Sequence, residues 1–182
     1  AQWADSVVFQ HAVSLVFQPE SMALRFAKAP PEFVQTFIAD RSKLFSGGQA
    51  SRLPAEQAKH QWPAFMGRLQ AQLDASGGEF LFGEASLADI AMAHPLWFLR
   101  ATPVTSPLVD GYPAVAAWLD RVLAFGHGNP QELDSEAAVE VARAATPAAL
   151  PEEAFSDPNG FKAGQRVAIS AIDYGVEAVE GE

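Results

Sequence analysis

The sequence predicts an all-α domain followed by a short β-like extension. Apolar residues recur at helical spacing through the first 130 residues, and prolines and paired glycines separate the helical segments. No strand pattern occurs before residue 150, and the glycine motifs of dinucleotide- and phosphate-binding folds are missing. We therefore expect a helical bundle over residues 1–145, with a linker and a truncated β-hairpin over residues 146–182.

Composition limits the classes of protein that this chain can represent. Its 182 residues are 49% hydrophobic, which is enough for the core of one medium domain. A formal net charge of −10 disfavours nucleic acid as a partner, because phosphate binding needs a basic face. The absence of cysteine excludes disulfides and thiolate nucleophiles. No apolar run is long enough for a membrane helix and no secretory leader is visible, so we expect a cytoplasmic protein without a membrane partner.

Charge is distributed unevenly along the chain. Residues 1–130 hold 11 acidic and 9 basic residues, whereas residues 131–182 hold 11 acidic and 3 basic residues. Only 19% of all residues are charged, below the usual value of about 25%, so we expect further apolar surface to be buried against a partner. The chain begins without methionine inside a helical pattern and stops after a second strand-like segment, which suggests a longer protein.

The first predicted helix, residues 1–18, has one narrow polar stripe. Apolar residues cover most of its circumference, and the stripe is formed by Gln2, Ser6, Gln10, Ser14 and Gln18. No Lys, Arg or Glu occurs between Asp5 and Glu20, although a solvated helix face normally carries charge. We expect the stripe to face a cleft or another chain. A core helix with a thin solvated edge is an equally open interpretation.

Three further helical segments follow before residue 77. They are expected at residues 20–28, at 31–44, where Pro31 suits the first turn, and at 54–76. Pro63 within the last segment predicts a kink or a division into two helices. Gly77 and Gly78 provide the left-handed backbone that ends a helix.

Ser86 and Asp89 have the spacing of a capping box at the start of a helix that runs to Arg100. This helix is almost wholly apolar, so we expect it to be the buried central helix and His94 to be a core residue. A loop over residues 102–112, a helix over 113–125 and a weaker helix over 135–145 follow. The end of the chain then predicts a strand over 165–172, a turn over 173–175 and a returning strand over 176–179.

Two sequence runs resemble the C-terminal domain of glutathione S-transferases. They are FLFGEASLADIA over residues 80–91 and YPAVAAWLDR over residues 112–121, and the helix order extends the resemblance over residues 1–130. The resemblance implies that Ser86 and Asp89 are a structural capping box in the core. It also implies that the first helix borders an active-site cleft and the interface of a homodimer. Glutathione would be bound mainly by an N-terminal thioredoxin-like domain, which these residues do not contain.

The function that follows is transfer of glutathione to a hydrophobic electrophile, with this domain binding the electrophile. We expect Trp3, Phe9, Gln10 and Val13 to contact that substrate and no catalytic residue to lie in this chain; core packing explains Phe9 and Val13 equally well. The four histidines, His11, His60, His94 and His127, form no recognisable metal-binding motif, so we expect no metal site. The alternative is a non-catalytic binding or assembly module on the same fold.

Overall fold

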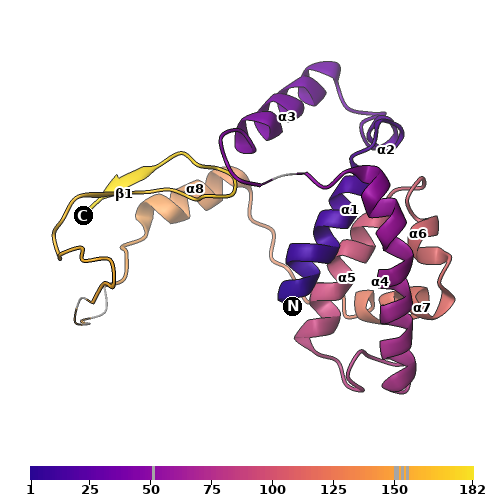
Figure 1. Cartoon of the computed structure of the whole chain (residues 1–182). Coiled ribbons are helices and arrows are strands. Elements are labelled where there is room, and N and C mark those ends of the chain that lie inside the picture. The colour runs from indigo at the N-terminus through magenta and orange to yellow at the C-terminus, as the bar shows by residue number, and fades with distance from the viewer. Residues whose placement is uncertain (51, 150–151, 153, 155) are drawn as a thin grey trace.

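The computed structural model describes residues 1–50, 52–149, 152, 154 and 156–182. Parts of the predicted linker, at residues 150, 151, 153 and 155, lie outside the described residues. A helical body is built from six elements packed side by side (Figure 1). These are the π-helical turn η1 (Ala4–Val8) and the helices α1 (Phe9–Val16), α4 (Ala55–Ala75), α5 (Leu87–Arg100), α6 (Pro107–Asp110) and α7 (Pro113–Leu123).

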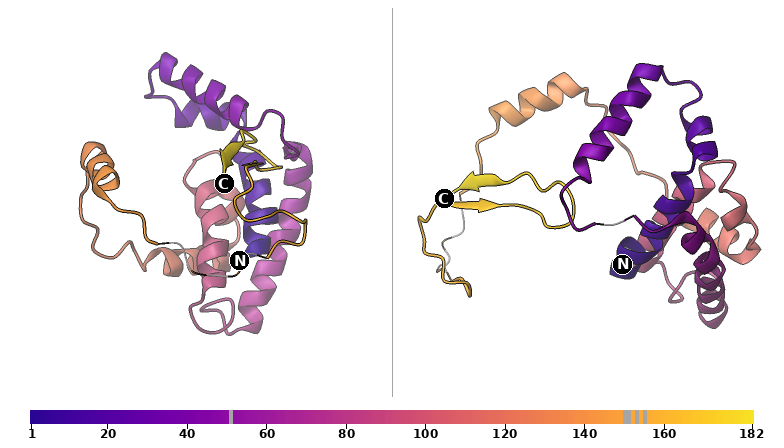
Figure 2. Two further views of the ribbon diagram at one scale, coloured as in Figure 1. Left: turned by 90° about the vertical axis from the view of Figure 1, so that its left-hand side faces the viewer. Right: turned by 45° about the horizontal axis from the view of Figure 1, so that its top comes forward.

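Two helices lead away from this body between α1 and α4. The short helix α2 (Pro19–Arg25) is followed by α3 (Pro31–Leu44), which stands apart from the body in both views of Figure 2. Pro31 begins α3, as its sequence predicts. No residue of α3 is buried, and Phe33 and Ile38 are each 54% exposed. Phe33 and Phe37 of α3 contact the ring of Phe26, just after α2, with centroids 6.2 and 5.2 Å apart, but no residue of α3 is thereby buried.

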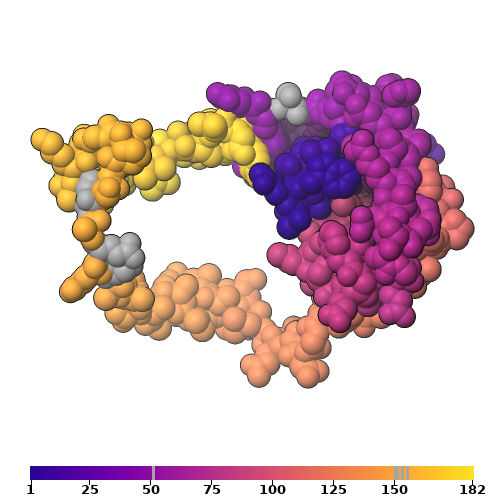
Figure 3. Space-filling model, turned by 60° about the horizontal axis from the view of Figure 1, so that its bottom comes forward, coloured from indigo at the N-terminus to yellow at the C-terminus, as the bar shows by residue number. Residues whose placement is uncertain are grey.

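An acidic arm follows the body and returns to it. The arm holds α8 (Ser135–Ala144), which buries no residue, and the antiparallel strands β1 (Val167–Ile169) and β2 (Val179–Gly181). Figure 3 shows that the arm, α3 and the body surround an opening. The strands are shorter than predicted and their connection, residues 170–178, is longer, because the middle of that connection contacts the segment between α3 and α4.

We call this contact the clasp. The amide of Gly175 donates to the carbonyl of Leu44 at 2.7 Å, and Gln49 and Ala50 donate to the carbonyls of residues 172 and 173 at 2.9 Å each. Lys43 and Glu177 add an ion pair of 2.9 Å. Three backbone hydrogen bonds, one exposed ion pair and a contact between the rings of Phe45 and Tyr174, 5.2 Å apart, therefore join two segments that are distant in the sequence.

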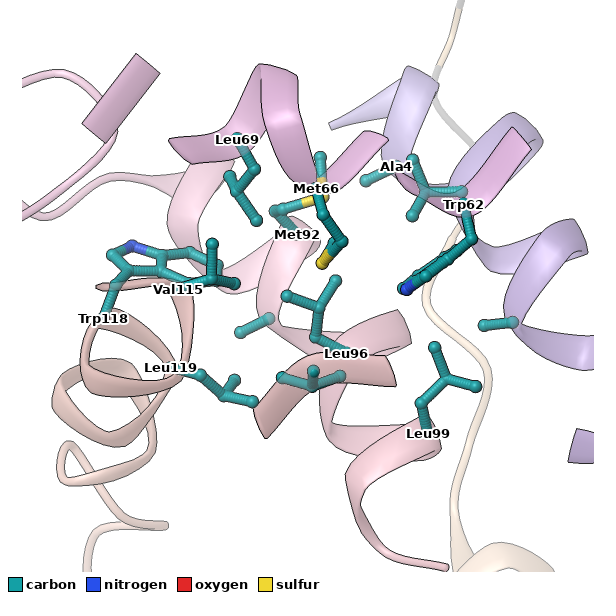
Figure 4. Close-up of a cluster of buried hydrophobic side chains, with 14 of the residues drawn as sticks. Ala4, Trp62, Met66, Leu69, Met92, Leu96, Leu99, Val115, Trp118 and Leu119 are labelled. Carbon is teal, nitrogen blue, oxygen red and sulfur yellow. The ribbon is translucent and has the colours of Figure 1, made fainter. Parts of the chain in front are cut away.

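The core of the body lies between the first helix (η1 and α1), α4, α5 and α7 (Figure 4). Residues spaced three or four apart on each helix point into it, as helical periodicity requires. They include Trp62, Met66, Leu69, Met92, Leu96, Leu99, Val115, Trp118 and Leu119. The predicted helix over residues 54–76 is one continuous helix, α4, so its division at the exposed Pro63 does not occur.

The predicted polar stripe of the first helix is exposed in its first part and partly covered in its second part. Gln2, Ser6 and Gln10 are exposed, whereas Ser14 is buried and donates from its hydroxyl to the carbonyl of Leu53 at 2.7 Å. The stripe is therefore covered only where the start of α4 approaches it. The described residues leave the exposed part of the stripe without cover.

The prediction that α5 is buried on all sides is wrong. Leu87, Ile90 and Trp97 are 69%, 57% and 48% exposed, and His94, expected in the core, is exposed too. The other elements of the body contact only one side of α5. Within the described ranges, none of the helices is both long and apolar enough to cross a membrane.

Candidate functional site

Asp89 is the most completely bonded polar group in the body. Its Oδ2 accepts from the backbone N–H and the hydroxyl of Ser86, at 3.0 and 2.7 Å, which forms the capping box. Its Oδ1 accepts from the backbone N–H of Leu81 at 2.8 Å and from the indole N–H of Trp118 at 2.9 Å. Four donors match the four lone-pair sites of a carboxylate, so none is left for chemistry on a substrate.

These donors stabilise the ionised form of Asp89. Burial by itself raises the pKa of the carboxyl, but the bonds from Leu81, Trp118 and Ser86 outweigh burial and leave the pKa below its ordinary value. The ionised carboxylate thus ties the loop before α5 to α7. This geometry is that of a structural residue.

A mostly apolar cleft of about 430 Å³ lies beside η1, between α4 and the loop that leads to α5. That volume is typical of sites for small molecules. Its lining residues are Ala1, Trp3, Ala4, Arg68, Leu69, Gln72, Leu81, Phe82, Ala88 and Met92. Arg68 supplies the positive charge among them.

The four predicted substrate contacts lie on different flanks of the first helix. Trp3 borders the cleft and meets the Phe65 ring of α4 edge-on, with ring centroids 5.5 Å apart. Phe9 lies on the α5 side, where it stacks on His94 at 4.8 Å. Gln10 is exposed and Val13 is half-buried. The structure therefore does not bring Trp3 and Phe9 to one point.

A second feature of the α5 side is a continuous row of aromatic rings, which sequence reasoning missed. We call it the aromatic strip, and it consists of His94, Phe9, Phe98 and Phe17. Neighbouring centroids are 4.8, 5.8 and 6.1 Å apart. The strip joins α1 to α5 across about 80 residues of sequence, so local spacing gives no signal for it.

Two arginines lie over this strip. The guanidinium carbon of Arg25, in α2, is 4.6 Å from the ring centroid of Phe98, and its Nε–H donates to the buried hydroxyl of Thr102 at 3.0 Å. The guanidinium carbon of Arg52 is 5.8 Å from the ring centroid of Phe17. Both separations are within the range of cation–π contacts.

The described residues offer binding surfaces but no activated nucleophile. No serine hydroxyl in that part of the chain is hydrogen-bonded to a histidine ring. His11 is buried, with its ring nitrogens 2.8 Å from the Val7 carbonyl and 2.6 Å from the Gln61 amide oxygen. The described residues also contain no group of three acidic or histidine side chains able to hold a metal ion.

The chain is similar to known proteins in both sequence and fold. Residues 55–121 match the family described as glutathione S-transferase, C-terminal domain. The chain is similar to a GST-like protein from Pseudomonas syringae, with 57% identity and a TM-score of 0.70 over 99% of this chain. The match covers 53% of that protein, so the chain spans about half of its length. No curated protein matches the chain.

Proposed function

Because this chain carries a glutathione S-transferase C-terminal domain, we propose that it is the substrate-binding part of a protein that transfers glutathione to a hydrophobic electrophile. The apolar cleft beside Trp3 is the observation that carries this proposal. An apolar wall with few polar groups suits a hydrophobic substrate. The described residues supply that wall, and they need supply no nucleophile because the attacking group belongs to glutathione.

Glutathione binding is a general property of the family. The tripeptide carries two carboxylates, whereas Arg68 is the cation that lines the cleft. The cleft therefore suits the electrophile better than glutathione, which a thioredoxin-like domain would bind. When bound, glutathione supplies a thiolate sulfur that forms a C–S bond to the electrophilic carbon, while the leaving group departs with its bonding pair.

We propose Trp3, Phe9, Gln10 and Val13 as contacts for the electrophile. Each is exposed or half-buried in the single chain, so each has surface available to a ligand. The cleft supports this role for Trp3, which lines it, whereas Phe9 lies on the α5 side of the first helix and is not part of the cleft lining. The role of Ser86 and Asp89 is to hold the fold rather than to react.

The proposal includes a cytoplasmic homodimer with the first helix near its interface. The exposed Gln2, Ser6 and Gln10 support this arrangement, since they form an uncharged face that this chain leaves open. The net charge of −10 argues against nucleic acid as a partner. Residues 1–145 would be the substrate-binding domain, and residues 146–182 an extension of separate role.

The test uses the natural protein that contains this chain. We expect it to be retained on glutathione-agarose and to conjugate glutathione with 1-chloro-2,4-dinitrobenzene. Trp3→Ala removes an apolar wall, so it should raise KM for the electrophile severalfold and leave KM for glutathione unchanged. Phe33→Ala, on the exposed face of α3, is the control and should change neither.

A protein that neither binds the resin nor forms the conjugate would contradict the proposal. That result would favour the alternative, a non-catalytic binding or assembly module. The exposed apolar residues of α3 and α8, such as Phe33, Ile38 and Val141, are the feature that favours this second function. Large exposed apolar patches commonly mark interaction surfaces.

A further inference from the structure

We propose that the arm, residues 131–182, packs around the remaining half of the natural protein, with α8 and the β1–β2 hairpin each laying one apolar face on it. By the remaining half we mean the counterpart of the part of the Pseudomonas syringae protein that this chain does not cover. The arm lies outside residues 55–121, which match the family, so the family leaves the role of the arm open. The inference goes beyond the proposed function, because it concerns assembly and requires no transferase activity.

The helix α8 has an apolar side and a charged side. Helical spacing places Ala138, Val141 and Ala142 on one side, opposite Glu140 and Arg143, which form an ion pair. All three apolar residues are exposed in this chain, and Val141 is 62% exposed. A ten-residue helix is marginal by itself in water, and it gains most of its stability by packing an apolar side on a partner. The pattern of α8 therefore indicates a partner.

The hairpin of β1 and β2 is two-sided in the same way. Ile169 and Val179 lie directly opposite each other in the strand register, so their side chains share one face, and they are 70% and 75% exposed. Glu180 lies on the other face and forms an ion pair with Arg166 at 3.1 Å. A hairpin of two strands is also marginal alone. Both elements of the arm thus have an apolar face without cover among the described residues.

The opening beside the body is the place for that cover. The arm leaves the body after α7 and returns to it through the clasp, so that the arm, α3 and the body surround the opening (Figure 3). The N-terminus lies on the side of the body that faces the arm (Figures 1 and 2). Protein that fills the opening would therefore contact the body and the arm at once.

The Pseudomonas syringae protein favours the remaining half over a second copy of the chain as the occupant. It matches 99% of this chain, which includes the arm, and the match covers 53% of its own length. About as much chain again therefore has to be placed in a protein that shares both the body and the arm. A covalently connected half is present at high effective concentration, which favours it over a separate copy.

The first experiment measures how accessible the two sides of α8 are in the natural full-length protein. Residues 1–182 contain no cysteine, so a cysteine introduced there can be followed by peptide mass spectrometry. Val141→Cys tests the apolar side. The matched control is Glu140→Cys on the charged side, where the side chain is 68% exposed. We expect iodoacetamide to react at least about tenfold more slowly with Val141→Cys than with Glu140→Cys, because cover has to open locally first.

The second experiment identifies the cover. Val139 lies at the edge of the apolar side and is 47% exposed, so Val139→Cys can carry benzophenone maleimide without entering the contact. The modified protein is irradiated as an equal mixture of 15N-labelled and unlabelled molecules. We expect cross-links from α8 to the remaining half, within one isotopic copy.

Equal reaction rates for Val141→Cys and Glu140→Cys would overturn the proposal, because the apolar side would then be open to solvent in the natural protein. Cross-links between isotopic copies would overturn it in favour of a second copy. Cross-links confined to residues 1–182 would overturn it as well. Neither experiment requires glutathione, so a covered arm in a protein without transferase activity would contradict the proposed function and leave this inference standing.

Discussion

The helical body and the outer helices all carry apolar residues, yet among the described residues only the body buries them. Leu96 of α5 is 0% exposed, whereas Phe33 and Ile38 of α3 are each 54% exposed. The difference lies in their neighbours: α5 contacts η1, α1, α6 and α7, and α3 has no buried residue. Helical periodicity thus indicates which face of a helix is apolar, but a second element decides whether that face is buried.

The two regions are also held by different forces. The body is stabilised by a continuous apolar core, including two tryptophans with 1% and 0% exposure. The arm is attached through the few backbone hydrogen bonds and the exposed ion pair of the clasp, and through one contact between the rings of Phe45 and Tyr174, 5.2 Å apart. We therefore expect the body to unfold as one cooperative unit and the clasp to open locally at lower free energy.

Asp89→Ala should have the largest effect on the unfolding free energy, because it destabilises the helical body. It leaves the indole N–H of Trp118 and the backbone N–H of Leu81 buried without acceptors, which costs about 3–5 kcal/mol in unfolding free energy. Urea denaturation followed by circular dichroism measures this loss. Asp74→Ala, at an exposed position of α4, is the control and should change the free energy by less than about 0.5 kcal/mol. Equal effects would show that Asp89 does not support the core.

The pH dependence of the unfolding free energy of the body should reflect the ionisation of Asp89. The pKa of Asp89 is lowered in the folded state, so its stabilisation is complete above the ordinary value of about 3.9. It is lost as the pH falls through the lowered folded pKa. Between about pH 5 and pH 2, the unfolding free energy should fall less steeply with decreasing pH in Asp89→Ala than in the wild type, as urea denaturation would measure. Parallel curves would contradict this assignment.

Gly48→Ala should have the smallest effect on the unfolding free energy and should release the arm. An added Cβ would lie 1.9 Å from the carbonyl oxygen of Asp173, a backbone atom, so the clasp has to open. Hydrogen exchange at Gly175 and Gln49 should accelerate while the buried amides of the body keep their protection. The control is Gly67→Ala, within α4, where no atom lies within 4 Å. It should stabilise the body by up to about 1 kcal/mol. Unchanged exchange in Gly48→Ala would show that the clasp does not hold the arm.

Local signals in the sequence predicted most element boundaries. Pro31 and Pro113 begin helices, and Gly77 and Gly78 follow the end of α4 with φ of 89° and 88°. The short helix α6 was missed, since its four residues were included in a predicted loop. One turn of helix is too short to show a period.

The candidate site was less accessible to sequence reasoning. Trp3 does border the cleft, but the arginines over Phe17 and Phe98 were not anticipated. Arg25 and Phe98 lie 73 positions apart, and nothing in the pattern around either residue indicates the other. Such pairs arise from the packing of α1 and α2 against α5.

The sequence by itself determined the helical class, the capping box of Ser86 and Asp89 and the resemblance to the glutathione S-transferase C-terminal domain, because all three depend on residues close together in the chain. Only the tertiary structure decided that α5 has one exposed apolar side, that the arm returns to the end of α3, and that two arginines lie over the aromatic strip. Periodicity fixes which way a side chain points from its own helix, whereas its cover, its partners and its access to a ligand depend on elements that are distant in sequence.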